Sequence, residues 1–530
     1  MTLSVSHSGA VSDAVNRFVP DLVNDKVASR LFAKDHTLWG KDAESESAIR
    51  LGWVDAAQNS MHLIPELKAL RAELLAEDIT RVVLCGMGGS SLAPEVITKT
   101  AGVELVVLDS TDPSQVRNAL NGDLTKTAVV VSSKSGSTVE TDSQKRSFEE
   151  AFESVGIDKT DRIFIVTDPN SPMHAQAVKD GYRVFLADPM VGGRYSALTA
   201  FGVVPSLLAG ADVEQMLASA ISSTPALSRD DASNPGLILG AAIARTASSR
   251  GFKDKLGFVP DGSTVVGFGD WVEQLIAEST GKLGRGVLPV VLEANSHEVS
   301  SPGDDTLLIG LAETASQSKF ELAVSGELGE LLLLWEVATA VASRLLEVNP
   351  FDQPDVESAK IAARKLLDSP ADTLVYDFSE SDIDIAALGF EPISKTLVGA
   401  VEALLAQAED DSYFAIHCYL NREKYSAASV LRELIAAKAN RPTTFGWGPR
   451  FLHSTGQYHK GGPKQGVFLQ IVSGDGDDLP IPGREFGYRQ LIDSQSAGDA
   501  RVLASAGSKV LILRLSDVES GIHSLVEAIK

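Results

Sequence analysis

The apolar residues of this chain gather in short continuous runs that are separated by polar or glycine-rich turns. From residue 81 onward these runs alternate with helical patterns. Continuous rather than alternating apolar character is typical of strands covered on both faces, as in a doubly wound parallel sheet. The runs that we expect to form strands are RVVLCG, VELVVLD, TAVVVSS, RIFIVTD and YRVFLAD, followed by KLGFVP, LPVVLE, TLLIGL, YFAIHCYL, GVFLQIVS and KVLILRL.

This pattern predicts an α/β fold with two doubly wound parallel-sheet domains. The residues before the first run show helical patterns, and the chain closes with an amphipathic helix. The expected division is a helical N-terminal segment (1–80), a first domain (81–212), connecting helices (213–253), a second domain (254–516) and a C-terminal helix (517–530). Within the second domain, residues from about 365 to 410 have few strand signals and are interpreted as a helical insertion.

The charge and composition of the chain narrow its possible partners. The 530 residues carry a formal charge of −24, with a pI near 4.8. An acidic surface argues against sequence-independent binding of nucleic acid or of an anionic membrane, because both need a basic face. The most apolar stretch, residues 328–348, contains Glu330, Glu336 and Arg344 and is therefore predicted to be a buried helix and not a membrane span.

Cysteine and histidine placement gives no sign of a disulfide framework or a metal site. Cys85 and Cys418 are the only cysteines, and both adjoin apolar runs, which is typical of packed thiols. The histidines show no HExxH spacing. The first 25 residues lack the basic start and apolar run of a secretory signal. We therefore expect no cofactor, no metal and a cytoplasmic location.

A glycine-rich loop follows the first predicted strand. Gly86-Met87-Gly88-Gly89-Ser90-Ser91 stands between that strand and a helical pattern. Glycines allow a close backbone approach, and a helix N-terminus offers N–H groups to an anion, so the loop suits phosphate. A dinucleotide site is the alternative, because Gly86, Gly88 and Asp109 fit that fingerprint, but its third glycine position is Ser91.

The second loop favours a monophosphate. In Ser132-Ser133-Lys134-Ser135-Gly136-Ser137-Thr138, six of seven residues carry a hydroxyl or ammonium donor, more than a solvated turn requires. A dinucleotide domain would not need this second hydroxyl-rich loop. Neither loop matches the GxxxxGK[ST] pattern of nucleoside triphosphate binding.

Two further segments contain candidate catalytic residues. Arg194 follows Gly192 and Gly193, which would let the backbone and a planar guanidinium approach the same ligand. Gln274 and Glu278 stand four residues apart and share one face of a predicted helix. Glu278 could act as a general base, although an isolated glutamate is more often a solvated helix residue.

In this order, GMGGSS, SSKSGSTVET, GGRYS and AESTGK strongly resemble the glucose-6-phosphate isomerase family, whose members have two sugar-isomerase domains. Residues 349–360 (NPFDQPDVESAK) and 452–458 (LHSTGQY) resemble two more of its motifs, so that the likeness spans about residues 80–460. The segments WGKDAESESAIRLGWVD and PIPGREFGYRQLIDSQSAGD look like the isomerase portion of transaldolase–isomerase fusion proteins.

The resemblance implies a reaction and a role for each matched residue. The reaction would interconvert glucose 6-phosphate and fructose 6-phosphate through a cis-enediol, with Glu278 moving the proton and Arg194 stabilising the enediolate. Lys360 and His453 would open the sugar ring. The substrate-binding residues would be Gly89, Ser90, Ser133, Lys134, Ser135 and Thr138 at the phosphate, together with Gly193, Gln274 and Gln353.

One departure from the family pattern concerns the order of the motifs. Usual bacterial members have the histidine motif before the lysine motif, whereas here Lys360 precedes His453 by 93 residues. The second domain is therefore expected to have a different element order, and His459 is an alternative to His453. A dual-specificity glucose/mannose phosphate isomerase and a catalytically silent sugar-phosphate-binding regulator remain alternatives. The only expected partner is the sugar phosphate; the oligomeric state is open, a homodimer included.

Overall fold

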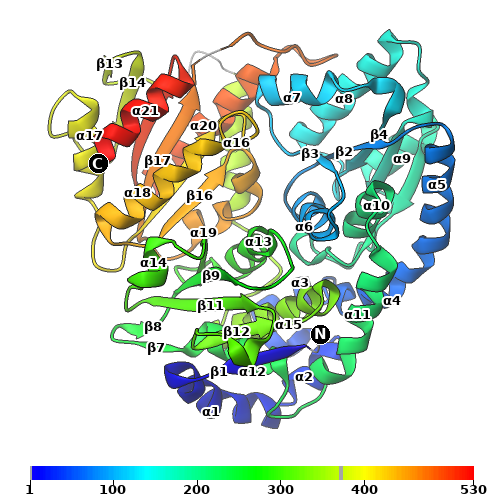
Figure 1. The fold of residues 1–530 in the computed structure, drawn as a ribbon, viewed down its shortest axis with the longest axis vertical. Coiled ribbons are helices and arrows are strands. Elements are labelled where there is room, and N and C mark those ends of the chain that lie inside the picture. Colours follow the sequence, from blue (N-terminus) through cyan, green and yellow to red (C-terminus); the bar gives the residue numbers. More distant parts are fainter. Residues whose placement is uncertain (1–2, 369–373, 475) are drawn as a thin grey trace.

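The computed structural model describes residues 3–368, 374–474 and 476–530 and contains three mainly parallel sheets with helices around them (Figure 1). The α/β class with doubly wound parallel sheets is confirmed, and every run predicted as a strand contains one. The strands of the predicted second domain, residues 254–516, are distributed over two of these sheets.

The first sheet is parallel throughout and has the strand order β3-β2-β4-β5-β6. Its order reverses between β2 and β4, and such switch points are where doubly wound folds bind ligands. Its strands are β2 (Arg81–Gly86), β3 (Val106–Leu108), β4 (Thr127–Ser132), β5 (Ile163–Thr167) and β6 (Arg183–Leu186). Its helices are α6 (Leu92–Ala101), α7 (Pro113–Leu120), α8 (Val139–Ser154), α9 (Pro172–Asp180) and α10 (Ala200–Ala209).

The second sheet repeats this pattern in β10-β9-β11-β12 and adds β1 from the N-terminal segment as an antiparallel edge strand. Its strands are β1 (Ser4–His7), β9 (Lys255–Asp261), β10 (Leu288–Val291), β11 (Thr306–Ala312) and β12 (Leu322–Ser325). The accompanying helices are α11 (Val213–Leu227), α12 (Pro235–Arg245), α13 (Phe268–Thr280), α14 (His297–Ser300) and α15 (Leu328–Leu346), and β7 (Ala247–Ser248) pairs with β8 (Gly251–Phe252).

The third sheet again has this order, β16-β15-β17-β18, and continues into antiparallel β14 and β13. Its strands are β13 (Phe378–Glu380), β14 (Ile383–Leu388), β15 (Tyr413–Tyr419), β16 (Thr443–Trp447), β17 (Gly466–Ser473) and β18 (Lys509–Leu515). Its helices are α17 (Leu397–Leu405), α18 (Val430–Ala439), α19 (Gly456–Gly461), α20 (Tyr488–Ser505) and α21 (Val518–Ile529), and α16 (Val356–Asp368) precedes it.

Two parts of the chain differ from the expected helices. The N-terminal segment holds α1 (Gly9–Asn24), α2 (Val27–Phe32), α3 (Glu44–Ser47), α4 (Ala56–Ser60) and α5 (Ile64–Ala76), but it begins with strand β1. The segment at about 365–410, expected as a helical insertion, contains β13 and β14 as well as α17. β1 and β13 have four and three residues, none of them buried, and give little apolar signal.

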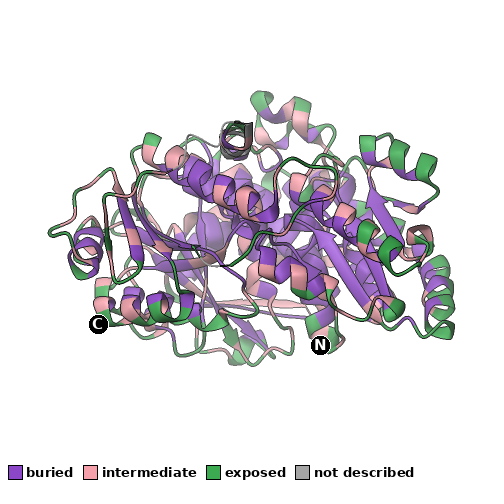
Figure 2. Ribbon diagram, turned by 90° about the horizontal axis from the view of Figure 1, so that it is seen from above, coloured by how far each residue is buried: buried purple, intermediate pink, exposed green. Residues whose placement is uncertain are grey.

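Successive residues of the strands enter different hydrophobic cores. In β2, Val82 and Leu84 face the core shared with α6 and α10, whereas Val83 and Cys85 face the core shared with α7, α8 and α9. Burial on both faces explains the continuous apolar runs in the sequence. Figure 2 shows the result, with buried strands inside and exposed residues on the outer helices.

Helix α13 lies where the three sheets and their helices meet (Figure 1). It packs against α6 and the short helices η5 (Gly88–Ser90) and η8 (Gly193–Tyr195) of the first sheet, α15 of the second and α19 of the third. Its residues Gln274 and Glu278 are buried at this junction. Each sheet with its helices is called a unit below, numbered as the sheets are. The fold therefore positions α13 by contacts from all three units.

Candidate active site

Two loops at the switch point of the first sheet form a hydroxyl-rich cradle. One loop, after β2, leads through η5 into α6, and the other, after β4, ends at Thr138, the residue before α8. Ser90 and Ser133 are buried, and Ser133 Oγ lies 3.3 Å from Thr138 Oγ1 and accepts a hydrogen bond from the Gly136 amide at 3.1 Å. Both loops leave the same end of neighbouring strands, since Gly86 pairs with Ser132, and both lead into a helix N-terminus that is suited to phosphate.

The remaining donors of the second loop are engaged within it or beside it. Ser135 is exposed, and its hydroxyl lies 2.9 Å from the hydroxyl of Ser137. Lys134 forms an ion pair with Asp168, which follows β5. Burial raises the pKa of Asp168, and the ammonium of Lys134 opposes that shift. In this structure the ion pair of Lys134 therefore connects the second loop to the residue that follows β5.

Gly89 brings the cradle against the loop that carries Arg194. A Cβ atom at Gly89 would lie only 1.9 Å from the carbonyl oxygen of Gly193, so that only glycine fits this backbone approach. Gly88 has a φ of +55°, and a Cβ atom there would lie only 2.7 Å from the carbonyl oxygen of His453. Both glycines are therefore needed to hold the cradle against its neighbours.

Gly89→Ala is expected to push η5 and η8 apart and to reduce turnover by about 10²-fold, since small displacements of positioning groups are costly. Steady-state assay and thermal unfolding of the variant would measure this. Gly192→Ala is the matched control, because its φ of −71° suits alanine and its Cβ would meet only Arg50 Cδ at 3.9 Å. Equal activity of both variants would contradict the close approach.

Arg194 and Glu278 lie side by side at the mouth of the cradle. Arg194 Nη1 is 3.4 Å from Glu278 Oε1 and donates a hydrogen bond to the Glu278 carbonyl at 3.1 Å. Both side chains are buried. A fixed guanidinium next to a carboxylate places a permanent positive charge beside a proton acceptor.

Gln274 connects the carboxylate to the third unit. Its Nε2 donates to Glu278 Oε2 at 3.2 Å and to the carbonyl of His453 at 2.7 Å. The predicted shared face of Gln274 and Glu278 is therefore present, and it is buried instead of solvated.

The segment after α15 closes the site on the other side. Arg194 Nη1 donates to Gln353 Oε1 at 3.3 Å, and Nη2 donates to the carbonyl of Asp352 at 2.9 Å. Lys282 fixes this segment through hydrogen bonds to the carbonyls of Asn349 and Asp352 and an ion pair with Asp352. Burial and the nearby Arg194 lower the pKa of Lys282 to about 8. Lys282 belongs to the AESTGK motif, but the sequence suggested no role for it.

His453 reaches the cradle from the third unit. It ends the short helix η11 (Arg450–His453) after β16, and its Nε2 lies 3.0 Å from Oε1 of Glu140, in the first turn of α8. Glu140 Oε1 also accepts a hydrogen bond from Gln495 Nε2 of α20 at 2.7 Å. The sequence did not predict that Glu140 contacts His453 and Gln495. More than three hundred residues separate Glu140 from His453, and likewise from Gln495.

His459 has a different environment. It is buried in the third unit, where its Nδ1 lies 2.9 Å from the Tyr413 hydroxyl and its ring stacks on Tyr413. Burial lowers the pKa of His459 well below the usual value, with smaller contributions from His417 and Lys460. The ring of His459 contacts Tyr413, His417 and Phe468 of the third sheet.

The predicted residue Lys360 lies on α16, but its side chain is outside the part of the structure that is described. The described residues of α16 pack against α19, α20 and η11. The helix that carries Lys360 is thus next to the segment that carries His453. In the chain, α16 with Lys360 precedes the third sheet, and His453 follows a strand of that sheet. The lysine motif therefore comes before the histidine motif.

The site combines the cradle, the buried carboxylate–guanidinium pair and the nearby histidine. These features define an enzyme that transfers protons on small phosphorylated substrates. Comparisons with known proteins agree. The sequence model of the family described as phosphoglucose isomerase matches residues 71–283. A probable glucose-6-phosphate isomerase of Haloarcula marismortui is 30% identical over 359 residues, which cover 57% of this chain and 82% of the relative. The chain therefore belongs to the glucose-6-phosphate isomerase family.

One further relative and two solved structures are also similar to this chain. A glucose-6-phosphate isomerase of Mycoplasma capricolum is 28% identical over 389 residues, covering 60% of this chain and 90% of the relative. A hypothetical protein of Thermus thermophilus matches at 25% identity and a TM-score of 0.57, covering 69% of this chain and 100% of its own. A glucose-6-phosphate isomerase of Chlamydia trachomatis shares the fold, at 19% identity, a TM-score of 0.53 and coverages of 68% and 86%.

In the three described ranges of the chain, no helix is both long and apolar enough to cross a bilayer.

Proposed function

We propose that this enzyme interconverts glucose 6-phosphate and fructose 6-phosphate through a cis-enediol, with Glu278 as the base. The single observation that supports this most directly is the position of the Arg194–Glu278 pair beside the phosphate cradle. Aldose–ketose isomerisation moves one proton between two adjacent carbons, so that one positioned carboxylate is sufficient. The test is a coupled assay of fructose 6-phosphate conversion, with glucose 6-phosphate and mannose 6-phosphate measured side by side.

The two loops of the first sheet would bind the phosphate. Ser90, Ser133, Ser135 and Thr138 would donate hydroxyls, with the Gly89 backbone beside them. Neutral donors suit this task, because the phosphate takes no part in the chemistry and must bind equally in both reaction directions. Lys134 would add positive charge from its position next to Asp168.

Proton transfer is assigned to Glu278, and charge stabilisation to Arg194. Arg194 Nε and Gln274 Oε1 are buried and have no hydrogen-bond partner among the described residues. Unpaired buried polar atoms are costly, so both atoms are well suited to pair with the hydroxyls of a bound sugar. A guanidinium already fixed in the site stabilises the developing enediolate without rearrangement. Gly193 and Gln353 would complete the contacts with the sugar.

Ring opening is assigned to His453 together with Lys360. An imidazole ring can both donate and accept a proton. Glu140, 3.0 Å from Nε2, would hold the ring in one orientation. Gln495 would in turn fix Glu140.

Isomerase activity is expected to persist without added metal. Among the described side chains, no cluster of three or more histidine, cysteine or acidic residues could hold a metal ion. Dialysis against EDTA should leave the rate unchanged within a factor of about two, well under 1 kcal/mol in the barrier. Loss of activity that returns on adding a divalent ion would contradict the metal-free mechanism.

We also expect a cytoplasmic enzyme, in keeping with the acidic composition and the two buried free cysteines. The oligomeric state is open, and a homodimer is one possible assembly of this enzyme. Size-exclusion chromatography with light scattering would determine the assembly.

A further inference from the structure

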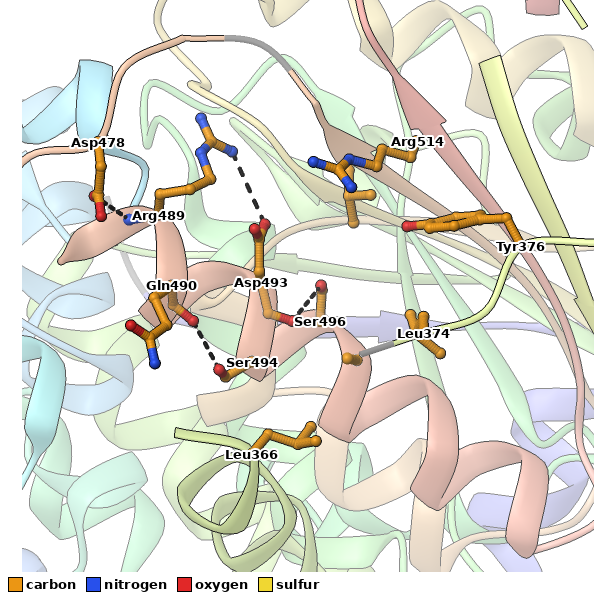
Figure 3. A pocket seen from close by; sticks show the side chains of 12 residues that line it. Leu366, Leu374, Tyr376, Asp478, Arg489, Gln490, Asp493, Ser494, Ser496 and Arg514 are labelled. Carbon is orange, nitrogen blue, oxygen red and sulfur yellow. Dashed lines mark hydrogen bonds and ion pairs between the residues drawn. The ribbon is translucent and has the colours of Figure 1, made fainter. Parts of the chain in front are cut away.

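A cavity of about 290 Å³ lies in the third unit at the carboxyl ends of β17 and β18 (Figure 3). Val472 of β17 and Arg514 of β18 line it, together with the first turns of α20. Its lining shares no residue with the cradle. Ligands of doubly wound folds bind at this end of the strands, so the location itself is suited to a small molecule.

Two donors in this cavity are available to a ligand. The guanidinium of Arg514 and the hydroxyl of Tyr376 form no hydrogen bond or ion pair with any residue that the structure describes. Figure 3 shows their polar ends pointing toward the same space as the carboxylate of Asp493. A guanidinium without a partner is a planar two-pronged donor, and its geometry matches a carboxylate.

The other charges of the cavity are already engaged. Arg489 donates a hydrogen bond to the Ser473 carbonyl at 3.1 Å and lies 4.0 Å from Asp493, and Asp478 accepts a hydrogen bond from the Arg489 amide at 2.7 Å. Two carboxylates beside two guanidiniums leave the cavity close to neutral. A dianion such as a phosphate monoester would be repelled by Asp478 and Asp493, whereas a monoanion can pair with Arg514.

Uncharged side chains make up the rest of the wall. Leu366 of α16, Leu374, Val472 and Ala497 are apolar, and Gln490, Ser494 and Ser496 are polar. A cavity of this volume is at the lower limit of small-molecule pockets. The ligand should therefore have an apolar body of a few carbons and one carboxylate.

We propose that this cavity is a binding site for a small aliphatic monocarboxylate, held by Arg514 and Tyr376 and packed against Leu366 and Leu374. The ligand would bridge α16 and α20, which are already joined by a hydrogen bond from Gln490 Nε2 to the Leu367 carbonyl at 3.5 Å. Helix α16 carries Lys360, and α20 carries Gln495, so the bound carboxylate would touch both helices that support the ring-opening groups.

The test is calorimetric titration of the full chain with butanoate, acetate and butanamide. Butanoate should bind with a Kd of about 1 mM, reasonable for six non-hydrogen atoms. Acetate should bind more weakly by about fourfold for each missing methylene, because the apolar wall contributes. Butanamide has nearly the same shape but no charge and should not bind measurably.

Variants and competitors locate the site. Arg514→Met should weaken butanoate binding at least about tenfold, the loss of one charge-assisted contact, while Arg250→Met, at an exposed arginine paired with Asp410, should not change it. Saturating fructose 6-phosphate should leave butanoate binding intact, which separates this site from the cradle whatever the catalytic outcome.

The acid–amide comparison uses the unaltered protein and holds even if Arg514→Met fails to fold. Equal binding of butanoate and butanamide, displacement of butanoate by fructose 6-phosphate or by inorganic phosphate, or unchanged affinity in a folded Arg514→Met variant would each overturn the proposal.

Discussion

Glu278→Gln is expected to abolish exchange of the C2 proton with solvent and to reduce turnover by about 10²–10⁴-fold, the usual contribution of a positioned base. The amide retains the size of the side chain and can still accept a hydrogen bond from Gln274, which now lies 3.2 Å from Glu278 Oε2. It cannot accept the proton. Loss of transition-state stabilisation without loss of ground-state binding should appear in kcat and not in KM.

The measurement is solvent deuterium incorporation at C2, with the sugar-phosphate affinity of the variant determined separately and expected to stay within several-fold. Glu273→Gln is the matched control, because Glu273 lies on the same helix and faces a different cavity, beside Asp270 and Arg450. The control should retain its proton exchange. Near-normal exchange in Glu278→Gln would assign the base to another group.

His453→Gln is expected to slow the turnover of cyclic glucose 6-phosphate far more than that of an analogue locked in the open-chain form. The glutamine can keep the hydrogen bond to Glu140, now 3.0 Å from His453 Nε2, but it cannot transfer a proton. A loss of about 10²-fold on the cyclic substrate alone is the expected size for one acid–base group. Parallel assays of the two substrates would measure the selectivity.

His459→Gln supplies the control for this experiment. His459 is buried against Tyr413 and stays neutral, so that its replacement should affect both substrates modestly and to the same extent. A selective loss in His459→Gln, or equal losses on the two substrates in His453→Gln, would show that the histidine motif has been assigned to the wrong function.

The strands of this fold could be predicted because most are buried on both faces. β2 and β4 are almost completely buried, and each contains a continuous run of four apolar residues, VVLC and AVVV. β1 could not be found in the same way, since its sequence SVSH is four residues long and only half-buried. β16 was also missed, because TTFGW mixes polar residues with glycine.

The candidate site was predictable only where the residues lie close together in the sequence. The Ser133–Thr138 contact within the second loop and the Gln274–Glu278 face depend on local spacing, and both are present in the structure. The contact of His453 with Glu140 joins two sheets and has no local signal. The engagement of Lys134 by Asp168 depends on the neighbouring strand β5, which the loop sequence alone does not reveal. Long-range packing decided these details.

The pairing of β1 with β12 has a consequence for the synthesis of the chain. The register joins Ser4 to Ser325 and Val5 to Val324, so the two strands leave the ribosome far apart in time. At about 5–20 residues per second, β1 waits roughly 15–60 s for its partner. During that interval β1 has no partner strand and is accessible to chaperones. A four-residue strand with serines at two positions is a poor template for pairing with other chains, which limits the risk of aggregation while it waits.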